Sequence, residues 1–113
     1  MGIKRKLSNP LNYKTVLGFK VELTNERKKH IFLQHPDIVE HFSRVKQILL
    51  APDEIRIDNQ DAQVLLFYKY FSKIGTGKYL VAVTKTNKRN FILTIYSTHR
   101  LKTGEKYEFK KPA

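Results

Sequence analysis

Acidic residues are missing from a long part of this chain. None occurs between Asp61 and Glu105, whereas eight Lys and Arg residues lie in that interval. The charge is therefore uneven: residues 62–113 hold 11 basic and 2 acidic side chains, and residues 1–61 hold 11 and 8. Aromatic residues are interleaved with these cations, among them Tyr68, Tyr70, Phe71, Tyr79, Phe91 and Tyr96. A folded surface of this composition suits a phosphate backbone, so we expect a nucleic-acid partner.

Several other features are absent. The chain has no cysteine, which excludes disulfides, thiolate zinc sites and a cysteine nucleophile, and fits the reducing cytoplasm where we expect it. No apolar run approaches the roughly 18 residues of a membrane span, and the basic start lacks the apolar segment of a signal peptide. There is no HExxH motif, the four His residues do not cluster and carboxylates are few, so we expect no metal and no other cofactor.

The length of 113 residues predicts one domain over residues 1–113. Residues 1–14 are polar and basic and predict a flexible arm. The core is expected over residues 15–100. Residues 101–113 are expected to form a tail or a short edge strand at Tyr107–Phe109.

Two helices are predicted before Pro52. Thr24 or Asn25 is a suitable N-cap for a helix that ends at about Gln34. His35 and Pro36 restart the chain. A second apolar helical face is then formed by residues at helical spacing, namely Ile38, Val39, Phe42, Val45, Ile48 and Leu49.

The rest of the chain has the period of β-strands. A short strand is expected within Val16–Leu23, and four further strands at 54–58, 63–71, 79–86 and 91–98. We therefore predict an α+β fold, with the N-terminal helices on one face of a four-stranded antiparallel sheet. In the last strand, alternation places Phe91, Leu93 and Ile95 toward the helices, and Ile92, Thr94 and Tyr96 on the exposed face.

Helical spacing places Arg27 and His30 on one face of the first helix. An Arg can hold a phosphate with two hydrogen bonds, and a His can act as a general acid or base near neutral pH. His35 is either a second imidazole of the same site or only a cap before Pro36. His30 is either catalytic or simply solvated.

Several short strings resemble a known family when taken in order. They are Glu26-Arg27 followed by His30-Ile31, then His35-Pro36, then Pro52-Asp53-Glu54-Ile55, and finally Tyr79 to Val83 with Phe91 to Tyr96. Over about residues 20–100 the chain resembles the phage-associated nuclease-like group of the barnase–EndoU–colicin–RelE (BECR) superfamily.

The resemblance implies the α+β fold above and metal-independent RNA cleavage, in which the ribose 2′-OH attacks its own phosphate and leaves a cyclic phosphate end. It assigns the catalytic site to Arg27, His30, His35, Thr94 and Tyr96. The cations expected to hold RNA are Lys69, Lys78, Lys85, Lys88, Arg89 and Arg100. A small basic nuclease also resembles the toxin of a toxin–antitoxin pair, which implies an acidic antitoxin or immunity protein as partner.

Two other functions fit the same residues. One is an RNA-binding module without catalysis, in which aromatic rings stack on bases. The other is a phage-derived interaction protein whose basic face binds an acidic partner.

Overall fold

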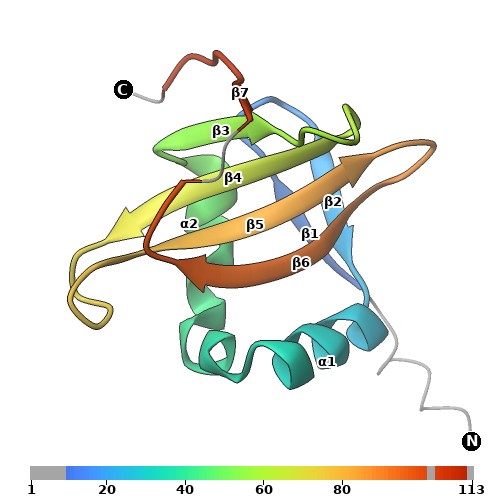
Figure 1. The fold of residues 1–113 in the computed structure, drawn as a ribbon. Coiled ribbons are helices and arrows are strands. Elements are labelled where there is room, and N and C mark those ends of the chain that lie inside the picture. Colours follow the sequence, from blue (N-terminus) through green and yellow to red (C-terminus); the bar gives the residue numbers. More distant parts are fainter. Residues whose placement is uncertain (1–9, 102–103, 112–113) are drawn as a thin grey trace, which may run out of the picture.

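The computed structural model describes residues 10–101 and 104–111 (Figure 1). Two helical stretches and a sheet make up the fold. The helical elements are α1 (Asn25–Gln34), the 3₁₀ helix η2 (Pro36–Arg44) and α2 (Val45–Leu50). The strands are β1 (Leu11–Lys14), β2 (Lys20–Leu23), β3 (Glu54–Ile57), β4 (Val64–Phe71), β5 (Lys78–Thr86), β6 (Asn90–Thr98) and β7 (Glu105–Lys106). The predicted α+β class is confirmed.

The sheet is larger than predicted. Among the described residues it has seven strands in the order β1-β2-β6-β5-β4-β3-β7. Its centre, β3 to β6, contains the four predicted strands as an antiparallel meander. The predicted count of four is wrong because the hairpin β1–β2 adds to the free side of β6, where β2 runs parallel to it, and β7 adds to β3.

The N-terminal segment is ordered where the structure describes it. Leu11–Lys14 pairs with β2 in antiparallel register, so the prediction of a flexible arm is wrong for these residues. Residues 1–9 of the predicted arm lie outside the described residues. The chain forms a turn at Thr15–Phe19, in which the Thr15 hydroxyl donates a hydrogen bond to the Phe19 carbonyl oxygen at 2.9 Å. Strand β2 therefore begins at Lys20, later than the start of the predicted range at Val16.

The C-terminal edge strand is real but lies earlier than predicted. It covers Glu105–Lys106 rather than Tyr107–Phe109. Gly104 precedes it with φ +152°, and an added Cβ there would lie 2.7 Å from the Ile57 carbonyl oxygen. The close approach of two backbones at this point therefore requires glycine.

The first helix has the bounds that the sequence predicts. The Thr24 hydroxyl oxygen accepts a hydrogen bond from the Arg27 backbone N–H at 3.1 Å, which caps the helix N-terminus. Glu26 in the first turn suits the helix dipole.

The second predicted helix is divided. Its first nine residues wind as the 3₁₀ helix η2, and only its last six form α2. Four residues make about one turn of an α-helix but one and a third turns of a 3₁₀ helix. Residues that would share one face of an α-helix therefore point in different directions in η2. Val39 is 53% exposed, and its predicted place on the buried face is wrong.

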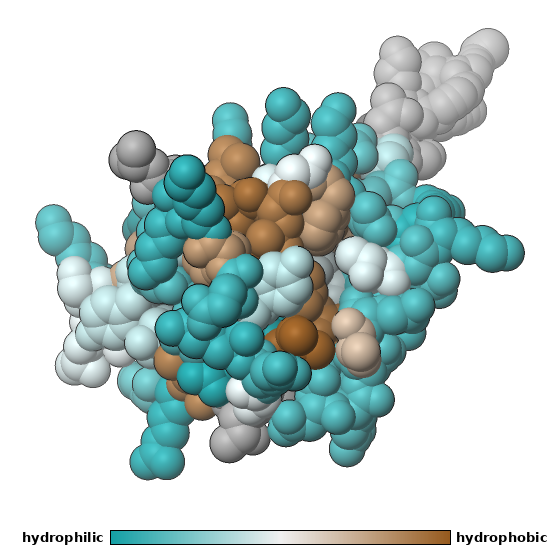
Figure 2. All heavy atoms as spheres, turned by 90° about the horizontal axis from the view of Figure 1, so that it is seen from above, coloured by the Kyte–Doolittle hydropathy of each residue, from teal (hydrophilic) through white to brown (hydrophobic). Residues whose placement is uncertain are grey.

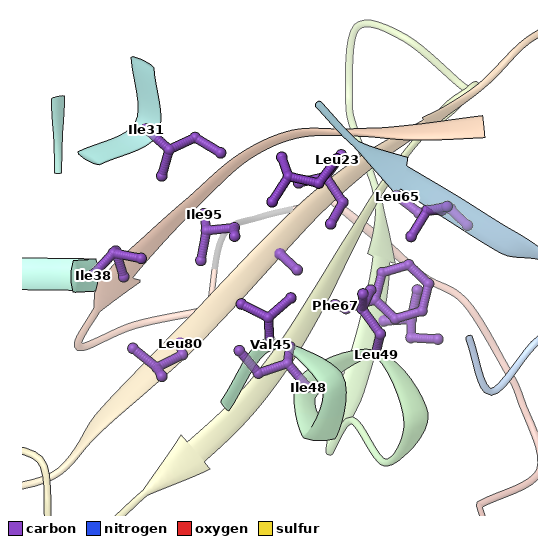
Figure 3. Packing of buried hydrophobic residues seen from close by; sticks show 14 of the residues in the cluster. Leu23, Ile31, Ile38, Val45, Ile48, Leu49, Leu65, Phe67, Leu80 and Ile95 are labelled. Atoms are coloured by element: carbon purple, nitrogen blue, oxygen red, sulfur yellow. The ribbon is translucent and has the colours of Figure 1, made fainter. Parts of the chain in front are cut away.

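The main core lies between the helices and one face of the sheet. Ile31 of α1, Ile38 of η2 and Ile48 of α2 pack with Phe67 and Leu80 of the sheet (Figure 3). A smaller cluster lies on the opposite face and is built from Val64, Leu66, Tyr68, Val81 and Val83, with Leu93, Tyr96 and Leu101 against it. Both faces of the central strands are therefore packed.

A β-bulge changes which side chains of β6 face the helices. Val83 pairs with Thr94 and Thr84 with Ile92, so Leu93 is an extra residue. Ile92 and Ile95 both lie in the main core, whereas Leu93 packs on the opposite face. The predicted assignment of side chains to the two faces is therefore wrong for Ile92 and Leu93 and correct for Ile95, which follows the bulge.

Figure 2 shows the molecule from above. Hydrophobic side chains gather at the middle of this face, and hydrophilic side chains surround them. Within residues 10–101 and 104–111, no helix is long and apolar enough to span a bilayer.

Candidate nucleic-acid interface

The start of α1 carries a pocket formed by Thr24, Glu26, Arg27 and His30, with a volume of about 250 Å³. We call it the α1 pocket. The Thr24 cap fixes the first turn, and His30 lies three residues after Arg27 and four after Glu26 along the helix. Arg27, Glu26 and His30 are all exposed. The structure thus brings together the Arg27 and His30 that the sequence pairs, and it adds a carboxylate.

A second pocket adjoins the first and shares Thr24 and Arg27 with it. It has a volume of about 240 Å³ and lies between β2 and the start of β6; we call it the β2–β6 pocket. Its other residues are Glu22, Arg89, Phe91 and Ile92. Arg89 pairs with the Glu22 carboxylate, whereas no described residue forms an ion pair with Arg27. Two guanidinium groups from distant parts of the sequence therefore line one cavity.

The register of β2 explains how Arg89 reaches the helix. Glu22 lies beside Phe91 in the parallel pair of β2 and β6, and Thr24 follows β2 directly. The turn before β6 is thereby held next to the first turn of α1. Of the two guanidinium groups, that of Arg27 has its full hydrogen-bonding capacity open to an anion.

His35, Thr94 and Tyr96 lie elsewhere. The His35 ring, between α1 and η2, lies beside the Tyr96 ring with centroids 5.9 Å apart. Thr94 and Tyr96 follow the bulge on the sheet face away from the helices, as predicted. Their hydroxyl oxygens are buried and make no hydrogen bond of good geometry, so the expectation that they are exposed donors is wrong. None of the three lines the α1 pocket or the β2–β6 pocket.

The Tyr96 phenol is held in its neutral form. Burial raises its pKa well above the usual value of a phenol, and the neighbouring Tyr68 adds to the shift. Tyr96 can therefore offer a proton to a hydrogen bond, and it cannot serve as a base near neutral pH.

Two predicted RNA-binding lysines are already engaged. The Lys85 ammonium donates to Asp61 Oδ2 at 2.9 Å, and this bond lowers the pKa of the Asp61 carboxyl. The Lys69 ammonium donates to the Ala51 carbonyl at 2.7 Å, beside the end of α2. Both groups are more constrained than a free surface cation.

The remaining predicted cations are spread along the sheet. Lys88 and Arg89 are exposed in the turn before β6, Arg100 is exposed after it, and Lys78 is partly exposed at the start of β5. Of these four cations, Arg89 lines the β2–β6 pocket, and the α1 pocket includes none of them. Such a distribution suits an extended anion more than a small one.

No metal centre is found in the described part of the chain, where no three His, Asp or Glu side chains gather closely enough to hold an ion. Comparison with protein-family models, with curated proteins and with solved structures finds no match.

Glu26 was missed as a candidate in the sequence. The available signal is its spacing, since Glu26 lies four residues before His30 on the same helix side. The sequence identifies Arg89 as a cation, but its place beside Arg27 depends on the pairing of β2 with β6, which local patterns do not reveal.

Proposed function

We propose that the protein is a metal-independent ribonuclease whose reactive groups lie in the α1 pocket. The observation that carries the proposal is the convergence of Arg27, Glu26 and His30 in one exposed pocket of a chain with a net charge of +12. A carboxylate, an imidazole and a guanidinium can supply the base, the acid and the charge stabilisation that RNA transesterification uses. The resemblance to the BECR superfamily supports the same function, and the antiparallel run β3 to β6 fits its four-stranded sheet.

The proposed reaction uses the three groups as follows. The Glu26 carboxylate takes the proton of a ribose 2′-OH as its oxygen attacks the adjacent phosphorus. Protonated His30 donates its proton to the departing 5′ oxygen. Arg27 stabilises the extra negative charge on the phosphorus oxygens. The P–O5′ bond breaks, and the products are a 2′,3′-cyclic phosphate and a free 5′-OH.

Helix geometry suits this division of roles. Residues four apart on a helix have Cβ atoms roughly 5–6 Å apart, so Glu26 and His30 can reach opposite sides of one phosphate. Arg27 lies between them in the sequence and also faces the β2–β6 pocket, where Arg89 is held by Glu22. His35, Thr94 and Tyr96 lie outside this pocket, and the buried hydroxyls of Thr94 and Tyr96 take no part in the proposed reaction.

The test is incubation of a mixed-sequence RNA with purified protein in EDTA, with analysis of the product 3′ ends. We expect wild-type protein to give cyclic phosphate ends, and we expect His30→Ala and Glu26→Gln to be slower by about 10²- to 10⁴-fold, the usual range for loss of an acid or base. His99→Ala is the matched control, because His99 is exposed and lies outside both pockets. Full activity of His30→Ala would exclude the mechanism.

RNA binding without cleavage is the second candidate. It is favoured by the separation of His35, Thr94 and Tyr96 from the α1 pocket, which leaves the set implied by the resemblance incomplete there. Salt-sensitive RNA binding with no products from any variant would select it. The toxin role and an acidic antitoxin remain part of the ribonuclease proposal, with growth arrest on expression, absent in His30→Ala, as the readout.

A further inference from the structure

The β2–β6 pocket contains a carboxylate that the proposed reaction does not use. Glu22 lies directly beside Phe91 where β2 and β6 pair, so the two side chains project from the same face of the sheet. The residues on either side of Glu22, Val21 and Leu23, are buried in the main core, so this face points away from the helices. Arg89 reaches the same face, because it pairs with the Glu22 carboxylate. An acidic group, a cation and an aromatic ring therefore meet on one side of the sheet.

The pocket extends from this face to the first turn of α1. Within the described residues, the parallel pair of β2 and β6 consists of Glu22 and Phe91, and β2 then leads into the Thr24 cap of the helix (Figure 1). Arg27 lines the pocket from the helix side, and it also lines the α1 pocket. A base bound in the β2–β6 pocket thus has its own phosphate within reach of the α1 pocket.

The Phe91 ring is a wall of this pocket and not a part of the hydrophobic core. It is partly exposed, and neither of the two clusters described above includes it. Proteins that bind single-stranded RNA stack bases on rings of this kind. The pocket volume of about 240 Å³ equals that of roughly eight water molecules at about 30 Å³ each, which is enough for one flat base.

The pair of Glu22 and Arg89 presents acceptors and donors side by side. The Glu22 side chain is 24% exposed and that of Arg89 is 72% exposed, so the carboxylate is enclosed by its neighbours while the guanidinium extends into solvent. An ionised carboxylate has about four lone-pair sites, so Glu22 can bind Arg89 and still accept hydrogen bonds from a ligand. The guanidinium also neutralises Glu22, so the carboxylate does not repel a phosphate backbone.

Guanine is the base that complements this pair. Its Watson–Crick edge carries two adjacent donors, N1–H and the 2-amino group, and one carboxylate can accept from both. Adenine, cytosine and uracil have a single donor group on that edge. Guanine O6 and N7 are acceptors to which an Arg can donate two hydrogen bonds.

We infer that the β2–β6 pocket binds guanine, with the base stacked on Phe91 and hydrogen-bonded to Glu22 and Arg89. The inference rests on the proposed function and names its preferred substrate, a guanosine whose 2′-OH attacks the phosphate held by Arg27. The attacking nucleotide is the one that has to be oriented most strictly, because its oxygen must lie in line with the bond that breaks. The cleavage products should therefore end in guanosine 2′,3′-cyclic phosphate.

The experiment measures binding of uncleavable 2′-fluoro RNA by fluorescence anisotropy. The strands have about ten nucleotides, a length within known single-strand site sizes, and carry one varied base in the middle of a uridine sequence. Wild-type protein should bind the guanine strand about tenfold more tightly than the adenine, cytosine and uracil strands, within the range for a bidentate contact to a base. Hypoxanthine, which differs from guanine only by the missing 2-amino group, should lose most of this advantage.

Three variants separate the parts of the pocket. Glu22→Gln should bind the guanine and hypoxanthine strands equally, because its amide has only one acceptor oxygen. Phe91→Leu should weaken binding of all strands about tenfold, because stacking does not distinguish the edges of the bases. Glu26→Gln is the matched control: it makes the same chemical change in the α1 pocket, so it should slow cleavage and keep the guanine preference.

Three results would overturn the inference. They are equal affinity of wild-type protein for the guanine and hypoxanthine strands, a guanine preference that persists in Glu22→Gln, and no binding by wild-type protein. Cleavage of a mixed-sequence RNA, measured separately, tests the ribonuclease proposal. A guanine preference in binding without cleavage would refute the nuclease alone, and cleavage after all four bases alike would refute the guanine pocket alone.

Discussion

Replacement of Thr94 by valine should make the protein more stable. Thr94 lies opposite Val83 on the smaller cluster's face, and its buried hydroxyl oxygen makes no hydrogen bond. A buried polar group without a partner costs about 1–3 kcal/mol. Valine has nearly the same shape, so it removes this cost without opening a cavity. We expect the free energy of unfolding to rise by about 1 kcal/mol, which corresponds to about 4 °C in Tm for a domain of this size.

The measurement is urea unfolding followed by circular dichroism, with the midpoint compared at an unchanged slope m. Thr15→Val is the matched control, because it removes a buried hydroxyl that does have a partner, the Phe19 carbonyl at 2.9 Å. There the midpoint should fall, by the equivalent of about 1 kcal/mol. A lower midpoint in Thr94→Val would refute the reasoning, since it would mean that the hydroxyl is satisfied in the folded protein.

The same variant tests whether the unpaired hydroxyl of Thr94 has a function. Groups that cost stability persist where they serve a ligand or a reaction. If Thr94 orients RNA, Thr94→Val should lose RNA affinity or cleavage while it gains stability. If both properties are unchanged, Thr94 has no part in the site.

Three further predictions concern local structure. Thr24→Ala removes the N-cap of α1 and should lower the free energy of unfolding by about 1 kcal/mol in urea titrations, whereas Thr24→Ser should retain it. Gly77→Ala should destabilise by at least about 1 kcal/mol, because φ is +112° and the new Cβ meets the Tyr70 hydroxyl; if Tyr70→Ala restores part of the loss, the steric cause is established. The pair of Asp61 with Lys85 should stabilise the protein at neutral pH and lose that effect in acid, because the pKa of Asp61 is lower in the folded than in the unfolded chain, where it is about 3.9. Asp61→Asn should therefore lower the urea midpoint at neutral pH and match wild type below about pH 2, and equal midpoints at both would contradict the assignment.

Local signals in the sequence predict much of the fold. The Thr24 cap and the Ala51-Pro52 stop delimit the helical region, and period-two runs separated by turn residues give the four central strands within one or two residues. These features depend on neighbouring residues, so the sequence pattern contains them.

The features that were missed depend on tertiary contacts. Strand β1 has only four residues and forms because β2 offers it a partner. No turn residue near Leu93 indicates the bulge in the sequence. The bulge places both Ile92 and Ile95 in the core. The 3₁₀ winding of η2 cannot be recognised in the sequence either, because its apolar residues have a spacing that is also typical of an α-helix.

The candidate site divides in the same way. Arg27 and His30 are one helical turn apart, so their proximity follows from the helix alone. The placement of Arg89 beside Arg27, of His35 beside Tyr96 and of Lys85 beside Asp61 each joins residues that are distant in sequence. Pattern reasoning selects such residues by type and cannot say which of them meet.

The strand order also bears on how the protein is made. Strand β2 has β6 as its neighbour, some seventy residues later in the chain, and the β2–β6 pocket is built from both. During synthesis the helix with Arg27 and His30 leaves the ribosome long before the turn with Arg89. The nascent chain therefore carries the first half of its candidate site without the second. The pocket closes only after β6 has been made and inserted between β2 and β5, so a ribosome-bound chain that ends before Asn90 lacks the complete β2–β6 pocket.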